Sequence, residues 1–205
     1  MWEQLASLCL NCGVDDEGEN LIKLSILITK EPLVLQLRSS LGSSALHYAV
    51  LGNNRPAAKL LLDRGLSVNE TNSLLQSPLH WAMQVRGSSM AKLLVSSGAS
   101  IDQKDSEGNT PLHWAVEQQN RKAIRFLLAH NADRNAPNFQ TQTPVLLSKI
   151  HRNSHITNIL EGREANPRNR LRRSQSNPEK GNPRFREIGA DNHTCKLRGS
   201  VTKMQ

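Results

Sequence analysis

The chain has 205 residues, only 3% of them aromatic, and a formal net charge of +8. So few aromatic side chains suit an elongated stack, in which each unit packs only on its neighbours, better than one thick core. No apolar run approaches the roughly 18 residues that span a bilayer. The start of the chain lacks the segments of a secretory signal, and its three cysteines are too few for a disulfide framework. We therefore expect a monomer without membrane insertion, in the cytoplasm or the nucleus.

The positive charge lies mostly in the last part of the chain. From Gly162 onward there are 11 Lys and Arg residues against 4 Asp and Glu residues, a net charge of 11 − 4 = +7. Residues 1–161 therefore carry only 8 − 7 = +1. The basic character belongs to a tail, and the part expected to fold is nearly neutral.

Residues 1–40 are predicted to form a degenerate first repeat or an N-terminal cap. Leu5, Leu8, Cys9 and Cys12 recur at the i, i+3, i+4, i+7 spacing of one helix face. The apolar segment 21–28 predicts a second helix.

A repeat of 33 residues follows. The block Ser-Ala-Leu-His-Tyr-Ala that begins at Ser44 returns as Ser-Pro-Leu-His-Trp-Ala at Ser77 and as Thr-Pro-Leu-His-Trp-Ala at Thr110. A weaker copy without the histidine begins at Thr143. A second shared block, apolar after its first basic residue, begins at Lys59, Lys92 and Arg125. Repetition at such a period is the signature of a solenoid built from stacked units.

Each repeated residue type has a local role. Ser or Thr caps a short first helix, Pro fits its first position, and the histidine three residues later can bond back to the cap or to a neighbouring turn. The second block predicts a second helix that ends in the left-handed conformation at Gly65, Gly98 or Asn131. Extended fingers then lead to the next unit, over residues 67–76, 100–109 and 133–142.

These blocks resemble the ankyrin-repeat family, whose signature includes Thr-Pro-Leu-His at this period. The resemblance implies an all-α repeat solenoid, an ankyrin stack of helix-turn-helix units with extended fingers. We place the units at about 41–72, 73–105, 106–138 and, in part, 139–161. Two departures stand out. Residues 72–76 lack the usual glycine, so we expect that finger to differ in shape. The last unit has Leu146 for the histidine and continues into a polar helix over 150–160, as suits a terminal unit.

The residue after each repeated histidine is aromatic. Tyr48, Trp81 and Trp114 recur at 33-residue spacing, so stacking places them in a row. Two interpretations stay open: the row packs neighbouring helices, or it forms an aromatic ladder at the foot of the fingers that grips an extended peptide. Other candidate binding residues are Gln84, Val85, Glu117 and Gln118, with Ser73, Leu74, Gln103, Lys104, Ser106 and Glu107 at the fingertips.

A narrower resemblance points to the ankyrin half of the ankyrin-bearing DHHC palmitoyltransferases. It is carried by Asn53-Asn54-Arg55 and by residues 75–82, Leu-Gln-Ser-Pro-Leu-His-Trp-Ala. In that family the ankyrin domain captures extended, Pro-containing substrate segments with a Trp that matches Trp81 and an Asn for which Asn53 is the nearest match. The Asp-His-His-Cys sequence is missing, so this resemblance implies substrate recruitment by a free-standing or truncated relative, and not transferase activity.

Residues for catalysis or metal binding are not evident. Cys9 and Cys12 are half a zinc site at most, and His151 and His155 lack a third ligand. The sequence therefore predicts a non-enzymatic protein-interaction module or adaptor that needs no cofactor and no metal.

Residues 162–205 are rich in Arg, Asn, Ser, Pro and Gly, a composition that predicts a disordered basic tail. Residues 173–178, Arg-Ser-Gln-Ser-Asn-Pro, resemble the phosphorylated motif that 14-3-3 proteins recognise, with Ser174 and Ser176 as candidate phosphosites.

The arginines of the same region are a candidate cluster for binding nuclear import carriers. A nucleic-acid-associated protein that acts through this tail is a further alternative, disfavoured because no aromatic residue interleaves the arginines to stack on bases. A solubilising tail is the remaining alternative. The cluster consists of Arg168, Arg170, Arg172 and Arg173.

Overall fold

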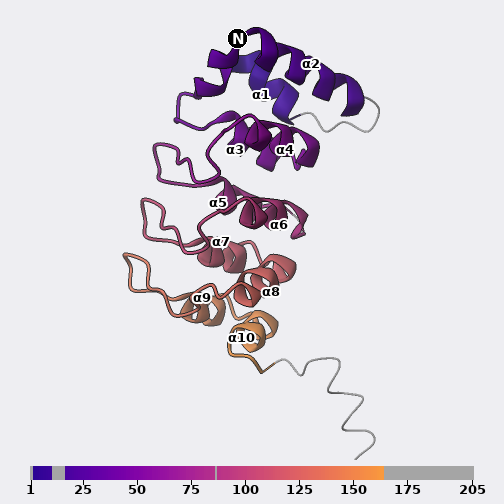
Figure 1. The fold of residues 1–205 in the computed structure, drawn as a ribbon. Helices are drawn as coiled ribbons and strands as arrows, with labels where there is room; N and C mark the ends of the chain where they lie inside the picture. The colour runs from indigo at the N-terminus through magenta and orange to yellow at the C-terminus, as the bar shows by residue number, and fades with distance from the viewer. Residues whose placement is uncertain (1, 11–16, 86, 164–205) are drawn as a thin grey trace, which may run out of the picture. The chain divides into compact units, whose positions relative to one another are not determined.

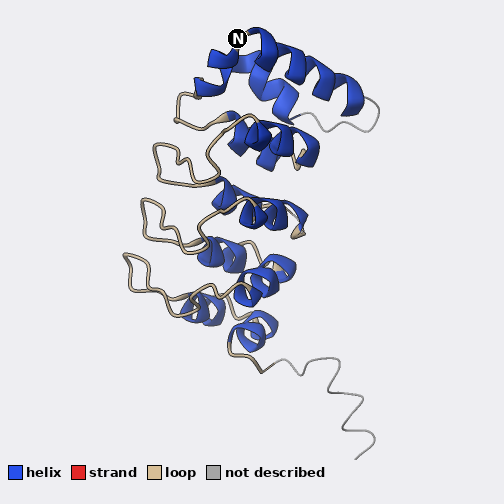
Figure 2. Ribbon diagram, in the orientation of Figure 1, coloured by secondary structure: helices blue, strands red, loops and turns tan. Residues whose placement is uncertain are grey.

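The computed structural model describes residues 2–10, 17–85 and 87–163, all within one compact unit. This part of the chain contains α-helices, one 3₁₀-helix and no β-strand (Figures 1 and 2). The helices are α1 (Trp2–Leu10), α2 (Glu17–Lys30), η1 (Pro32–Gln36), α3 (Ala45–Leu51), α4 (Arg55–Asp63), α5 (Pro78–Ala82), α6 (Ser89–Ser96), α7 (Pro111–Glu117), α8 (Arg121–Ala129), α9 (Pro144–Ile150) and α10 (Ser154–Leu160).

The helices form pairs that stack one on another (Figure 1). We call α1, α3, α5, α7 and α9 the inner helices, because each packs against the next one and the loops extend from their side. The others, α2, α4, α6, α8 and α10, are the outer helices. The predicted all-α repeat solenoid is confirmed.

Small and branched apolar residues at matching positions of the repeats make the core. Leu46, Leu79 and Leu112 of the inner helices are 0% exposed. Ala49 and Ala115, one turn later, are also 0% exposed and let neighbouring helices approach closely. The core therefore continues from unit to unit, as the repeat requires.

The repeated histidines join one unit to the next. The backbone N–H of Ser44 donates to Nδ1 of His47 (3.2 Å), and Nε2 of His47 lies 3.0 Å from the carbonyl oxygen of Gln76, at the end of the next finger. Since that carbonyl only accepts, Nε2 carries the proton. Since Nδ1 accepts from the Ser44 N–H, it carries none, and the ring is neutral. The same two contacts recur at His80 and His113. The predicted bonding to cap and neighbouring turn is confirmed.

Four loops that we call fingers, at residues 38–43, 67–76, 100–109 and 133–142, are joined to one another by main-chain hydrogen bonds. The N–H groups of Ser73, Ser106 and Phe139 donate to carbonyl oxygens of the preceding fingers, at 2.9, 2.9 and 3.0 Å. Inside the last three fingers, one buried side chain accepts two backbone N–H groups and closes the turn. These side chains are Asn72, Asp105 and Asn138.

The expectation that the glycine-free finger differs in shape is wrong. Leu75 takes the left-handed conformation, φ 56°, at the position where the next finger has Gly108, φ 79°. The turn bonds of the two fingers match, because Asn72 holds its loop as Asp105 holds the next one. A side chain that satisfies the backbone offsets the strain that leucine brings to this conformation.

The stack is closed at one end by α1 and α2. Leu5 and Cys9 of α1 are fully buried against the rest of the core. Gly52, at the end of α3, permits this docking, since a Cβ at this position would overlap the carbonyl oxygen of Leu10.

At the other end of the stack, one predicted helix differs from the observed structure. The expected helix over 150–160 is interrupted, because α9 ends at Ile150 and Asn153 caps the separate helix α10. At the predicted start of the tail, residue 162, the chain still makes backbone hydrogen bonds to α10. Gly162, φ 72°, and Arg163 belong to the cap of α10, where Arg163 donates its N–H to Asn158 (2.8 Å).

Candidate protein-binding surface

The aromatic row contains one ring more than the sequence predicted, Trp2, and its continuous ring contacts end at Trp81. The Trp2 and Tyr48 rings meet edge to face at 5.4 Å, and Tyr48 lies 6.0 Å from Trp81. Trp81 also packs against His47, at 5.3 Å, as Trp114 packs against His80, at 5.8 Å, but no ring contact among the described residues joins Trp81 to Trp114. All four rings are half-buried, so they contribute both packing and an exposed face. Trp2 was missed because it precedes the first recognisable repeat.

Two indoles are fixed by hydrogen bonds to the fingers. The Trp81 N–H donates to Gln76 Oε1 (3.0 Å), and the Trp114 N–H donates to Asp105 Oδ2 (2.9 Å). Each bond joins an inner helix to the finger that precedes it. The rings are therefore pre-organised, which lowers the entropy that a partner must lose on binding.

A small cavity of about 120 Å³ lies where Trp114 meets two fingers. Its walls come from both fingers and from α7. Ser106 and Glu107 are exposed, Leu74 is 45% exposed, and Asp105 is 4% exposed. The lining residues are Leu74, Gln76, Asp105, Ser106, Glu107, Asn109, Trp114 and Glu117. Four residues predicted at the fingertips or on the inner helices thus share one concave site with Trp114.

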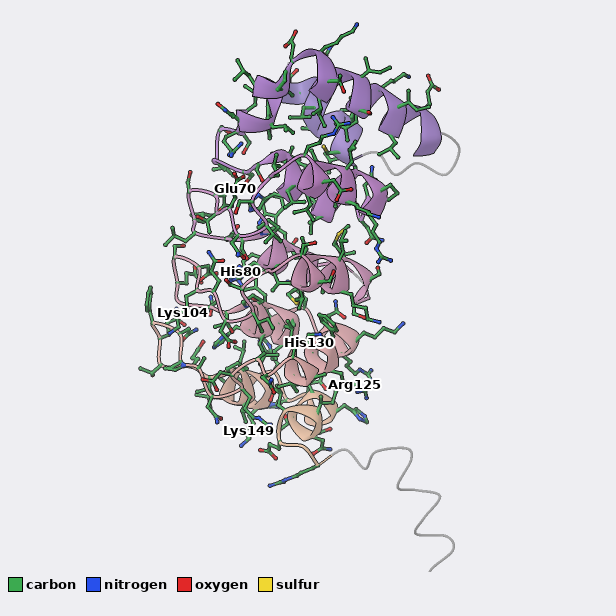
Figure 3. The ribbon with its side chains drawn as sticks, viewed as in Figure 1. Glu70, His80, Lys104, Arg125, His130 and Lys149 are labelled. Carbon is green, nitrogen blue, oxygen red and sulfur yellow. The ribbon has the colours of Figure 1, made fainter. Side chains whose placement is uncertain are left out.

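The surface around this cavity is acidic. Residues 67–82 and 100–117 contain five acidic residues and one basic residue, a net charge of 1 − 5 = −4. Asp105 accepts only from neutral N–H groups, two of the backbone and one of Trp114. The Lys104 ammonium donates a hydrogen bond of 2.8 Å to the carbonyl oxygen of Pro137 in the next finger. Figure 3 shows Glu70 and Lys104 on this side of the stack.

The comparison with family models decides the family. A model described as ankyrin repeats (3 copies) matches residues 15–105 and again 65–138, which together cover more than half of the chain. The chain belongs to the ankyrin-repeat family. No curated protein matches the chain. The narrower resemblance to ankyrin-bearing palmitoyltransferases therefore stays a prediction.

The fingertips of the ankyrin stack carry apolar residues that the sequence did not single out. Phe139 is 71% exposed and Leu41 is 58% exposed. They lie at the tips of the last and the first finger, with Leu74 between them. No periodic pattern in the sequence marks an exposed Phe or Leu at a turn. These residues come to lie on one edge of the stack only because the fingers are hydrogen-bonded to one another.

The remaining predicted fingertip residues differ in accessibility. Ser73 is exposed, and its N–H is used in the bond between fingers. Gln103 is half-buried, and its Oε1 is buried without a hydrogen-bond partner.

A second cleft, of about 630 Å³, lies at the turns that join inner to outer helices of the two central ankyrin repeats. Gln84, Glu117 and Gln118, all predicted binding residues, contribute exposed side chains. Val85 is half-buried, and its carbonyl oxygen accepts from Asn120 Nδ2 (2.8 Å).

Asn53 lies at the corresponding turn between α3 and α4. It is exposed and has φ 52°, a conformation that asparagine tolerates better than most residues. The positive φ of this turn is therefore sufficient to explain why an asparagine occupies position 53.

Several predictions concern residues outside the described part of the chain. They are the second cysteine of the half zinc site, Cys12, the candidate phosphosites Ser174 and Ser176, and the arginine cluster at 168–173. Within the described residues, no group of three or more His, Cys, Asp and Glu side chains is placed to hold a metal ion. No helix there is long and apolar enough to cross a membrane.

Proposed function

We propose that this ankyrin stack is a non-enzymatic adaptor that binds an extended protein segment between its fingers and inner helices. The observation that carries the proposal is the cavity where Trp114 meets two fingers, because a concave site with a fixed aromatic wall suits an anchoring side chain of a peptide. Exposed side chains at the fingertips, such as Ser106 and Glu107, would contact the rest of the segment. The net charge of −4 around the cavity favours a segment with basic or neutral side chains.

A selection from a random peptide library tests the proposal. The full chain is immobilised, enriched peptides are synthesised, and their Kd values are measured. Ser106→Arg would place bulk and positive charge into the cavity from an exposed position, without disturbing the core. We expect it to weaken binding at least about tenfold, the effect of losing roughly 1.4 kcal/mol.

Ser96→Arg is the matched control, since Ser96 is exposed on the outer helix α6. It should leave the Kd unchanged. Enriched peptides that bind both variants as they bind the wild type would refute the cavity as the binding site. A selection that enriches no peptide would refute the proposed function itself.

We further propose that the tail directs the adaptor, by binding a 14-3-3 protein when Ser176 or Ser174 is phosphorylated, or by binding an import carrier and so adding the nucleus to a cytoplasmic location. A synthetic peptide of residues 168–181 tests the first alternative. Its form phosphorylated at Ser176 should bind a 14-3-3 protein, and the unmodified form should not, because the phosphate supplies the charge that an Arg cluster recognises.

A further inference from the structure

The outer helices carry a row of basic side chains in register with the repeat. Lys59 of α4, Lys92 of α6 and Arg125 of α8 are each separated by 33 residues, and all three are exposed. Matching positions of stacked repeats lie above one another, so these side chains follow the length of the stack. Figure 3 shows Arg125 on the outer helices, away from the fingers that carry Lys104.

The row belongs to a wider basic face. Helices α4, α6 and α8 contain six basic residues and one acidic residue, Asp63, a net charge of 6 − 1 = +5. Since residues 1–161 have a net charge of only +1, the rest of that part carries 1 − 5 = −4. The fold therefore separates charges that are mixed along the sequence. None of the ion pairs found among the described residues involves Lys59 or Lys92.

The row continues onto α2 with an apolar residue. Ile26 lies 33 residues before Lys59 and is 48% exposed. Ile26 itself lines a cleft between α1 and α2, and another shallow cleft, of about 490 Å³, lies between α2 and α4. Its lining includes Leu21, Ile22 and Leu60, with Lys59 among the polar residues. One end of the basic row is thus able to hold an apolar side chain.

The spacing identifies a kind of partner. Packed helices lie about 8–10 Å apart, so the basic side chains of successive repeats are separated by about that distance. An α-helix advances about 10.5 Å in seven residues. Acidic side chains at i, i+7 and i+14 of a helix laid along the row would meet Lys59, Lys92 and Arg125 in turn. An apolar side chain at i−7 would reach the exposed Ile26 of α2.

We propose that the outer face of this stack binds an acidic amphipathic helix of a partner protein. Two features favour such a helix over a nucleic acid. The basic side chains are spaced like every seventh residue of a helix, and the apolar residues at one end of the row offer no contact for phosphate groups. Helices α4 and α6 carry no aromatic residue, and Phe126 of α8 is half-buried against the His130 ring, so the row lacks the stacking platform that single strands need.

Two synthetic peptides of equal composition test the proposal. Both are 25 residues long and rich in Ala and Gln. The first has Leu at position 3 and Glu at 10, 17 and 24, and the second has these four residues at irregular spacing. Binding of the labelled peptides to the full chain is followed by fluorescence anisotropy in about 150 mM salt. We expect the first peptide to bind at least tenfold more tightly. The basic tail attracts both peptides alike, so the ratio of the two Kd values reports on the row.

A matched pair of variants assigns the binding to the row. Lys92→Glu should abolish the preference for the first peptide, and Lys149→Glu, the same change on the inner helix α9, should preserve it. Circular dichroism shows whether both variants remain folded. Equal Kd values for the two peptides, or an unchanged preference in Lys92→Glu, would overturn the proposal. Single-stranded RNA or phosphatidylserine vesicles that bind more tightly than the first peptide, and that Lys92→Glu weakens more than it weakens this peptide, would overturn it in favour of those polyanions.

Discussion

The three repeated histidines are buried neutral residues that bond two parts of the stack at once. Burial lowers the pKa of each ring, and for His47 the pKa falls to about 4. The carbonyl that each ring contacts in the next finger opposes this shift, as does the charge of Asp105 for His80 and His113. Their role is to hold the fingers to the inner helices, and the row they form is not a set of metal ligands.

The stability of the stack should therefore depend on pH. Between the unfolded pKa of about 6.5 and the lowered native pKa, the unfolded chain binds protons that the native chain does not. The free energy of unfolding should then fall as the pH drops from 6.5 toward 4, and His47 alone should account for about 2 kcal/mol at pH 5.

Denaturant titrations at pH 8, 7 and 5 measure this effect. At pH 8 and pH 7 the histidines are mostly neutral in both the folded and the unfolded chain. Their contribution to the free energy of unfolding should therefore be nearly the same at these two pH values. Equal free energies at pH 7 and pH 5 would show that the rings do not resist protonation.

Gly52 is a second residue whose role becomes clear only from its neighbours. The Gly52→Ala variant should loosen α1, since the added methyl group overlaps the Leu10 carbonyl. We expect a loss of about 1–3 kcal/mol, as for overpacking in a dense core, and faster hydrogen exchange in α1. Gly18→Ala is the control, because nothing lies within 4 Å of a Cβ there. Exchange in α1 that is equally slow in both variants would contradict this packing.

At the scale of elements, the fingers show how one turn is built from different sequences. In each of the last three, an Asn or Asp side chain organises the loop, so the residue at the left-handed position can vary. Gly108 suits that position, whereas Leu75 adopts it at a cost of about 1–2 kcal/mol.

Replacing Leu75 by glycine should stabilise the stack. The gain should be at most about 1 kcal/mol, because relief of strain is partly offset by the greater freedom of an unfolded glycine, and Leu75 is half exposed and loses little burial. Gly108→Ala should have the opposite effect, since its Cβ would lie 2.8 Å from the Phe139 ring. Thermal unfolding measures both. A decrease in Tm for Leu75→Gly would show that Leu75 stabilises the finger by contacts that outweigh its strain.

At the scale of the whole molecule, stability depends on contacts between neighbouring units, so damage in the middle should affect the entire stack. Leu112 lies in α7 and is 0% exposed. Leu112→Arg buries a charge with no partner and should cost more than about 3 kcal/mol, with one cooperative loss of helical signal.

Leu74→Arg makes the same chemical change at a fingertip that is 45% exposed, and should leave the melting curve nearly unchanged. A Leu112→Arg protein that melts like the wild type would mean that α7 is not central to the stack.

The sequence by itself determined the family, the 33-residue register, the helix caps and the bonding role of the repeated histidines. These follow from local chemistry: Pro after Ser or Thr starts a helix, and Gly65, Gly98 and Asn131 end one with positive φ. The same reasoning failed at the glycine-free finger, because the stabilising contact of Asn72 is a side-chain bond that no propensity records.

Only the tertiary structure decided what the surfaces are. It placed Trp2 beside Tyr48, enclosed a cavity between Trp114 and two fingers, and gathered basic residues on the outer helices and acidic ones near the fingers. These arrangements join residues of neighbouring units, whose distance in space depends on how the units stack. A period in the sequence says that such residues share a row, but the packing of the units determines which rows are exposed, concave or charged.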